Sequence, residues 1–440
     1  MTSQYFELWE GLLLPVYLLV ILGIGYAIAP KQEKRLFMTG LSLRLGGSIA
    51  FASIYLFYYG GGDTIAYYQT AQPFVVLFYE QPMLALKAIY SSYSLENYSF
   101  FSVETGYPLH YIYSDNQTFT VSRILFHLLL FSFNSYIIST VVLAAISFIG
   151  PWKLFLMFKD LYGNKRNAAI AALFIPSVLF WGTGISKDTI TLTSATYLVY
   201  GIYYTFYKNE IKVSRMLGMV VSLYFILAIK PYIFMALTPG IILWLISSPI
   251  SRLKTPFLRR FAIPFIAVIS SVIFVLIVQQ LDDVLGSYAT DQIIEKAIVT
   301  QEDLKQDYYG GNSFDIGEVS ATFLGILSKV PIATLYGLYA PSLLQVNNIV
   351  MLLSALENTF LLYLTLKLLG TFRFKRIITT SLDHPILLFS IIFSLSLAFS
   401  IGFTTPNYGA MIRFKIPLIP FFVFYLMSLT MLIKKQKGKP

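Results

Sequence analysis

An aspartate that directly follows three glycines is the first group in this sequence whose type and spacing could do chemistry. The segment GGGDTIAYY contains Asp63 and, one helical turn later, Tyr67. Glycines let a backbone turn sharply and approach a ligand closely. A partly desolvated carboxylate at such a place can act as a general base or hold a divalent metal ion, and Tyr67 would line the same substrate site. Asp63 could also cap a helix that begins at Thr64, and the two roles can coexist.

Two lysines and a second aspartate stand at the ends of apolar segments further along the chain. Lys187 and Asp188 end the segment PSVLFWGTGISKD, and Lys230 precedes Pro231. Lys187 could hold a phosphate, or it could pair with Asp188 and cap the next helix. Adjacent residues on a helix point about 100° apart, so separate partners are plausible. Lys230 is a further cation for an anionic substrate.

A third group of polar residues lies near the C-terminal end, in the segment NYGAMIRFKIPLIP. It contains Asn407, Arg413 and Lys415. An arginine fork suits a phosphate or pyrophosphate, although these cations could also reach lipid headgroups. Arg123 and His127, which are four residues apart, share one face of a predicted helix. Together these residues predict a positive binding site for a lipid phosphate.

Composition argues against other kinds of site. The chain has no cysteine, which excludes disulfides, thiolate catalysis and cysteine-bound metals. The three histidines (His110, His127 and His384) are scattered, which disfavours a histidine-based metal site. No metal-ligand set is predicted, apart from a divalent ion at Asp63. The net charge of +10 comes from basic residues between apolar segments, so a nucleic-acid partner is not expected.

Membrane-spanning helices must position these residues. The 440-residue chain is 56% hydrophobic and only 12% charged, whereas soluble domains carry roughly 25% charged residues. Only a bilayer can solvate this much apolar surface. The sequence predicts an all-α polytopic integral membrane protein, with residues 1–440 in a single transmembrane domain. Eleven apolar runs are candidate spans: 12–29, 36–58, 137–157, 168–183, 189–207, 214–229, 232–249, 261–280, 349–368, 385–403 and 415–433.

The distribution of charge orients these spans. Connections on one side hold 22 of the 32 basic residues and only four acidic ones, as is typical of cytoplasmic connections. The N-terminus is therefore predicted to lie outside and the C-terminus in the cytoplasm. Ten basic residues lie elsewhere, and several of them are the site candidates named above. Another of the ten, Arg44 in the second span, is expected to reach toward the cytoplasmic surface.

Two connections on the outer side are long, at residues 59–136 and 281–348. The first contains apolar segments at Phe119–Leu130 and 73–91, which predict amphipathic helices that lie along the membrane surface. The second begins acidic and ends apolar, around Phe323–Leu344. Ordered loops of this length usually carry function, although a rigid lid without chemistry would also explain them.

A first outer loop with an acidic residue just after a transmembrane helix, followed by surface helices, resembles the GT-C superfamily of membrane glycosyltransferases. The segment PSVLFWGTGISKD looks like the pattern P-S-x-x-x-W-x-x-x-x-x-K-D of an uncharacterised bacterial branch near that superfamily. The segment NYGAMIRFKIPLIPFF is similar to its ending N-x-G-x-x-x-R-x-R-x-x-x-x-P-F, with Lys415 in place of the second arginine. Members often carry paired acids in the first loop. Here Thr64 follows Asp63, so the second carboxylate would be Glu104 or Asp188, or is absent.

The resemblance implies a glycosyltransferase of the bacterial inner membrane. It would move a sugar from a polyprenyl-phosphate donor to a glycan, lipid or protein acceptor on the periplasmic face. Asp63 would be the base, and the phosphate would be held by cations: Lys187, Lys230, Arg413 and Lys415. Two alternatives stay open. One is a transporter or flippase of a lipid-linked glycan, for which Glu357 in a predicted span is the best buried acid. The other is a polymerase or ligase of lipid-linked polysaccharide, which would take a pyrophosphate-linked glycan.

Overall fold

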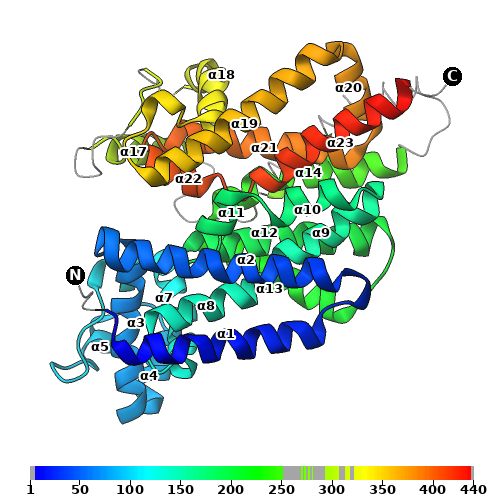
Figure 1. Ribbon diagram of the computed structural model, residues 1–440. Coiled ribbons are helices and arrows are strands. Elements are labelled where there is room, and N and C mark those ends of the chain that lie inside the picture. Colours follow the sequence, from blue (N-terminus) through cyan, green and yellow to red (C-terminus); the bar gives the residue numbers. More distant parts are fainter. Residues whose placement is uncertain are drawn as a thin grey trace. The chain divides into compact units, whose positions relative to one another are not determined.

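The computed structural model describes residues 5–250, pieces of 269–280, and residues 293–306, 313–317 and 322–437. Within these ranges every regular element is a helix (Figure 1), and one isolated β-bridge joins Ser313 to Asn407. The all-α prediction is confirmed for this part of the chain. The chain divides into two compact units, which are described separately below.

The first unit comprises Met1–Lys153, Val178–Tyr197 and Tyr224–Lys230. Its two long helices, α1 (Leu8–Ile28) and α2 (Lys34–Ser53), lie side by side in Figure 1. A 3-10 turn (Lys31–Glu33) precedes α2, and a π-helix (Ile54–Tyr59) extends it. The helices that follow are α3 (Asp63–Glu80), α4 (Pro82–Tyr90), α5 (Leu95–Tyr98), α6 (His110–Tyr113), α7 (Asn116–Phe131) and α8 (Tyr136–Ser147).

Four helices contribute residues to both units. These are α9 (Ile149–Tyr162), α11 (Pro176–Trp181), α12 (Lys187–Ile202) and α13 (Val213–Ile229). The second unit also contains α10 (Lys165–Leu173), a π-helix (Tyr203–Tyr207), α14 (Pro231–Ile250), α17 (Ile293–Asp303), α18 (Phe323–Tyr339), a 3-10 turn (Leu343–Gln345), α19 (Ile349–Thr371), α20 (Phe374–Asp383), α21 (Pro385–Thr404), α22 (Tyr408–Phe414) and α23 (Ile419–Lys437).

Among the residues that the structure describes, five helical stretches are long and apolar enough to cross a bilayer: Leu8–Ile28, Lys31–Tyr59, Tyr136–Tyr162, Ile349–Thr371 and Pro385–Thr404. A sixth results if α22 and α23, which are bent by 65° at the break between them, form one span. These stretches coincide with six of the predicted runs. The chain is therefore a helical membrane protein with several candidate spans.

The predicted number of eleven spans is not confirmed. Run 168–183 is divided into α10 and α11, because Pro176 disfavours helical geometry at the residue before it and itself starts a new helix. Runs 214–229 and 232–249 form shorter apolar helices, Val213–Ile229 and Pro231–Ser247. Run 189–207 corresponds to α12 and the π-helix that follows it. Run 261–280 lies largely outside the described residues.

The first long loop is a helical subdomain with an aromatic core. The ring of Phe74 on α3 lies 4.8 Å from that of Phe101, 5.3 Å from that of Tyr113 and 5.4 Å from that of Phe119 on α7. The predicted helix at Phe119–Leu130 is found within α7. The predicted helix at 73–91 is instead the end of α3 and all of α4, because the chain breaks at Gln81 and Pro82 starts a new helix.

In the second unit, small residues let α18 and α21 pack closely. A Cβ atom at Gly337 would lie 2.0 Å from the carbonyl oxygen of Ala398, and one at Gly402 would lie 1.9 Å from that of Ala333. Each helix thus carries two small residues four positions apart. This pattern lets helix backbones approach in membranes, where packing rather than water exclusion drives association.

Arg44 belongs to the interior of the first unit. It is 1% exposed, and its guanidinium donates to the Ala144 carbonyl (3.1 Å), the Ser147 hydroxyl (2.8 Å) and the Gly182 carbonyl (2.5 Å). These bonds connect α2 to α8 and to the turn after α11. The expectation that Arg44 reaches toward the cytoplasmic surface is therefore wrong, because neighbouring helices supply the acceptors that a lipid-facing arginine would seek at the interface.

Candidate functional site

Asp63 is the first residue of α3 and is exposed. The preceding glycines allow the chain to turn there. Gly60 has a φ of 63° and Gly62 a φ of 109°, and a Cβ at Gly62 would lie 2.9 Å from the ring of Tyr55. The helix thus begins one residue earlier than the capping alternative assumed, with Gly62 as the N-cap. A carboxylate in the first helical turn is stabilised by the helix dipole while it stays open to solvent.

The residues that follow Asp63 fix α3 in the core of the first unit. Thr64 is hydrogen-bonded to the hydroxyl of Tyr136 on α8 (2.8 Å). Tyr67, predicted to line a substrate site, is buried, and its carbonyl accepts a hydrogen bond from Ser122 on α7 (3.2 Å). Tyr67 is thus part of the core between α3 and α7, and its predicted role at a substrate site stays a prediction.

Lys187 connects the start of α12 to the first long loop. Its ammonium donates to the hydroxyl of Thr118 (2.6 Å) and lies 3.9 Å from the carboxylate of Asp115. Asp115 also caps α7 through the backbone amides of Gln117 and Thr118. The Lys187 side chain keeps 22% of its surface exposed. Lys187 is thus a positioned cation that stays partly open to solvent.

Asp188 has a different partner from its neighbour. Its carboxylate forms an ion pair with the ammonium of Lys230, and the two side chains are 1% and 5% exposed. Adjacent residues on a helix point about 100° apart, which agrees with the separate partners that Lys187 and Asp188 have here. The buried pair joins the start of α12 to the end of α13.

Residues close in sequence to Asp63, Lys187 and Lys230 belong to one hydrophobic cluster. Ile65 follows Asp63 by two residues, Ile190 follows Lys187 by three, and Ile229 directly precedes Lys230. All three isoleucines are buried in the same hydrophobic cluster of the first unit. The starts of α3 and α12 and the end of α13 thus each contribute a buried isoleucine to this cluster.

Arg123 and His127 form hydrogen bonds to other residues of the first loop. Arg123 donates to the carbonyls of Ile89 (2.8 Å) and Ser91 (2.9 Å), which joins α7 to the end of α4. His127 contacts the Arg123 carbonyl through Nδ1 (2.8 Å) and the hydroxyl of Tyr90 through Nε2 (2.6 Å). The two residues share a helix face as predicted, but their polar atoms contact protein groups. Their phosphate-binding role stays a prediction.

The second unit holds the remaining cations. Lys415 is 1% exposed, and its ammonium donates to the carbonyl of Ala340 (2.9 Å), the side-chain oxygen of Asn358 (2.5 Å) and, more weakly, the carbonyl of Leu338 (3.4 Å). Arg413 is half-buried on α22. Asn407 caps that helix through the amide of Ala410 (3.0 Å). The hydrogen bonds of Lys415 thus go to neutral acceptors, and the carboxylate of Glu357 interacts with it electrostatically.

Glu357 lies on α19, within a candidate span. Its carboxylate accepts hydrogen bonds from the backbone amide (2.9 Å) and the hydroxyl (2.6 Å) of Ser177. Both partners belong to the second unit. Glu357 is half-buried, and an acid in a candidate span is unusual and marks a place of functional interest.

Sequence reasoning missed three participants: Asp115, Thr118 and Asn358. For Asp115 and Thr118 the sequence held a signal. Asp115 directly precedes a segment whose apolar residues recur with the period of a helix, and N-cap residues occupy this position. Nothing local marks Asn358 as a partner of Lys415, since the two are 57 residues apart. Glu104, one of the two candidates for a second carboxylate, is exposed in the loop before α6.

No group of three acidic or histidine side chains that could hold a metal ion occurs among the residues the structure describes. A divalent ion at Asp63 would therefore have to take its other ligands from water or substrate. A pocket of about 470 Å³ in the second unit is lined by Leu368, Phe372 and the lysines Lys367, Lys434 and Lys435. None of the predicted site residues lines it.

Comparison of the chain with models of protein families, with curated proteins and with solved structures finds no match.

Proposed function

We propose that this protein is a membrane glycosyltransferase that moves a sugar from a polyprenyl-phosphate donor to an acceptor on the outer face. The observation that supports this most is the placement of Lys187. It is a partly exposed cation, held by Thr118 and Asp115, and its helix contributes to the same hydrophobic cluster as α3, which begins at the exposed carboxylate of Asp63. A cation and a carboxylate of this kind are what transfer from a phosphate requires.

Lys187 is suited to bind the phosphate of the leaving group. It is the first residue of a 16-residue helix, and helix N-termini favour anions through their amides and dipole. As the bond between the anomeric carbon and the phosphate oxygen breaks, negative charge grows on the phosphate. A positioned ammonium stabilises that charge more in the transition state than in the ground state.

Asp63 is suited to act as the general base for the acceptor hydroxyl. The acceptor hydroxyl attacks the anomeric carbon, and its proton passes to the Asp63 carboxylate while polyprenyl phosphate departs. The buried pair of Lys230 and Asp188 keeps its charge balanced internally, so we assign it a positioning role. It fixes the helix start from which Lys187 projects.

The test is transfer of a labelled sugar from a polyprenyl-phosphate-linked hexose by the purified chain in vesicles, with a cell-envelope extract as acceptor. Asp63→Asn should lower kcat by about 10²-fold or more, as loss of a general base does. Lys187→Gln should also lower kcat. The matched control is Glu80→Gln, which alters an exposed acid at the other end of the same helix. Full activity of expressed Asp63→Asn would contradict the assignment.

Transport of a lipid-linked glycan is the second candidate, and Glu357 is the observation in its favour. An acid in a candidate span, hydrogen-bonded to Ser177, is the kind of group that transport pathways use. Glu357→Gln would abolish activity while Asp63→Asn had no effect if this alternative were correct. A polymerase or ligase would instead require a pyrophosphate-linked glycan as donor, which the same vesicle assay distinguishes.

A further inference from the structure

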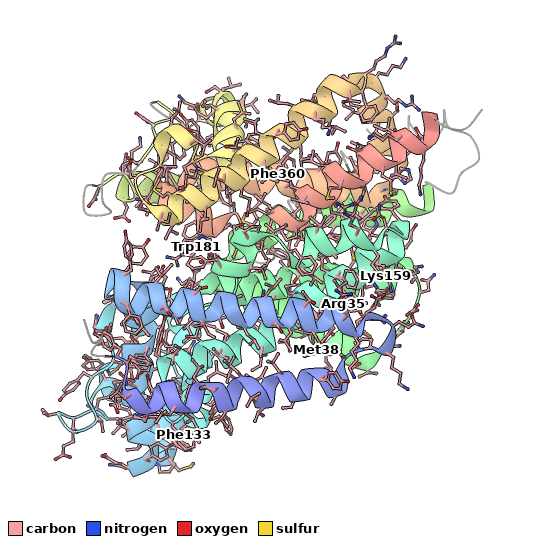
Figure 2. All side chains as sticks on the ribbon, viewed as in Figure 1. Arg35, Met38, Phe133, Lys159, Trp181 and Phe360 are labelled. Atoms are coloured by element: carbon pink, nitrogen blue, oxygen red, sulfur yellow. The ribbon has the colours of Figure 1, made fainter. Side chains whose placement is uncertain are left out.

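A polar pocket in the first unit is lined by none of the predicted site residues. It has a volume of about 360 Å³ and lies between the start of α1, the side of α3 and the connection between α7 and α8. Figure 2 shows Phe133, from that connection, beside the N-terminal end of α1. Pockets that bind small organic ligands begin at about this volume.

The pocket carries negative charge. Glu7 and Glu10 line it, and Glu10 is only 3% exposed. Glu10 accepts a hydrogen bond from the backbone amide of Glu7 (3.3 Å), and Glu7 accepts one from the indole of Trp9 (2.6 Å). No basic side chain is among the described residues that line the pocket. Burial, with the negative charges of Glu10 and Glu7, raises the pKa of Tyr68, which also lines it. This lining therefore disfavours an anionic ligand.

The pocket also offers an acceptor that the protein leaves unsatisfied. The side-chain oxygen of Asn134 is buried and accepts no hydrogen bond from the described residues. Asn134 and Phe133 have left-handed φ angles of 61° and 53°, which for a bulky residue such as phenylalanine is unfavourable. The nearby hydroxyl of Tyr68 is already used as a donor to the Asn134 carbonyl (2.8 Å). A ligand that donates hydrogen bonds would satisfy the side-chain oxygen of Asn134.

Aromatic rings complete the lining. Tyr5, Trp9, Tyr68 and Phe133 all border the pocket. The faces of aromatic rings attract cations, and a cage of aromatic rings is a recurrent way to hold an organic ammonium group. Carboxylates, an unsatisfied amide oxygen and aromatic rings together favour one type of ligand.

We propose that this pocket binds a primary ammonium group of about the size of ethanolamine. The N–H groups would donate to Glu10, Glu7 and the side-chain oxygen of Asn134, and the positive charge would offset the two carboxylates. This inference does not depend on the glycosyltransferase proposal. The ammonium could come from a phospholipid headgroup or from a free amine, since both present the same chemistry.

Calorimetric titration of the purified full chain in a maltoside detergent tests the proposal. Ethanolamine should bind with an affinity on the order of millimolar, because so small a ligand makes few contacts. Ethylene glycol, which replaces the ammonium by a hydroxyl, and glucose should bind at least about tenfold more weakly. A short-chain phosphatidylethanolamine that binds more tightly than ethanolamine identifies the headgroup as the source, and equal or weaker binding identifies the free amine.

Variants tie the binding to this pocket. Glu7→Gln, at an exposed position that tolerates the change, and Glu10→Gln should each weaken ethanolamine binding by about tenfold or more. Glu80→Gln is the matched control and should bind as the wild type does. Absence of amine binding to the wild type, equal binding of glucose, or binding that neither variant weakens would each overturn the proposal.

Discussion

The lysines of this protein differ in what balances their charge. Lys230 faces a carboxylate in a buried ion pair. Lys415 donates hydrogen bonds to neutral acceptors and interacts electrostatically with Glu357, and Lys187 keeps part of its surface exposed. These surroundings, rather than position along the chain, separate structural lysines from one that can contact a substrate. An exposed cation can exchange its partners for a phosphate at little cost, whereas a buried one cannot.

Breaking the buried pair should destabilise the protein. Lys230→Met leaves the Asp188 carboxylate buried without its cation, and we expect a loss of about 3–5 kcal/mol. The measurement is the midpoint of thermal unfolding in detergent. The double change Lys230→Met with Asp188→Leu should recover part of that loss, because it removes both charges. Lys87→Met, which breaks the exposed pair with Glu96, should leave the midpoint nearly unchanged. A wild-type midpoint for Lys230→Met would contradict the assignment.

The exposed ion pair of Lys87 and Glu96 predicts a pH dependence of stability that can be observed directly. The hydrogen bond from Lys87, together with its charge, holds the pKa of the Glu96 carboxyl below its ordinary value. The contribution of this pair to stability is therefore present above the ordinary glutamate pKa and is lost as the pH falls through the lowered one. In a carboxyl carbon-13 NMR titration, Lys87→Met should return Glu96 to the ordinary range. An unshifted Glu96 in the wild type would contradict this.

At the scale of helices, close contact depends on a few small residues. The contact between α18 and α21 places backbone against backbone at Gly337 and Gly402. Gly402→Leu cannot be accommodated by rotation of a side chain, because the obstructing atoms belong to the backbone of Ala333. We expect a destabilisation of about 1–3 kcal/mol or more, seen as a lower unfolding midpoint in detergent.

A matched control exists for this prediction. Gly370 lies in α19, and a Cβ there would meet no atom within 4 Å. Gly370→Leu should therefore unfold near the wild-type midpoint. If both glycine variants behaved alike, the close packing of α18 and α21 would not be the cause.

The sequence predicted where long apolar helices lie better than where helices break. The runs 12–29 and 385–403 closely match α1 and α21, because hydrophobic length is a local property. The break before α11 had a local signal in Pro176. The bend between α22 and α23 had Pro417, and was nevertheless missed within run 415–433.

Site residues were predictable by type but not by partner. Lys187 and Asp63 could be selected from the sequence because a charged residue at the end of an apolar run is costly to keep in or near a membrane and often has a function. That Arg123 would bind the carbonyls of Ile89 and Ser91 depends on which backbone atoms the fold brings near. No spacing in the sequence encodes that information.

At the scale of the whole molecule, the absence of cysteine makes topology directly measurable. A single cysteine can be introduced at Glu104, in the first long loop, or at Lys435, near the end of α23, and both positions are exposed. If the charge-based orientation holds, Glu104→Cys should react with an impermeant maleimide in intact cells. Lys435→Cys should react only after the membrane is permeabilised. Reaction of both from the same side would contradict the predicted orientation.

Arg44 has a consequence for how the protein is made. Its acceptors lie 100 to 138 residues further along the chain, and Gly182 is the last of them to be synthesised. At about 5–20 residues per second, α2 waits roughly 7–28 s for that carbonyl. An arginine in the middle of an isolated helix disfavours release into lipid by about 2.5–3.5 kcal/mol. The insertion machinery therefore has reason to retain α2 until α8 and α11 arrive, so that the first unit enters the bilayer as an assembled bundle rather than helix by helix.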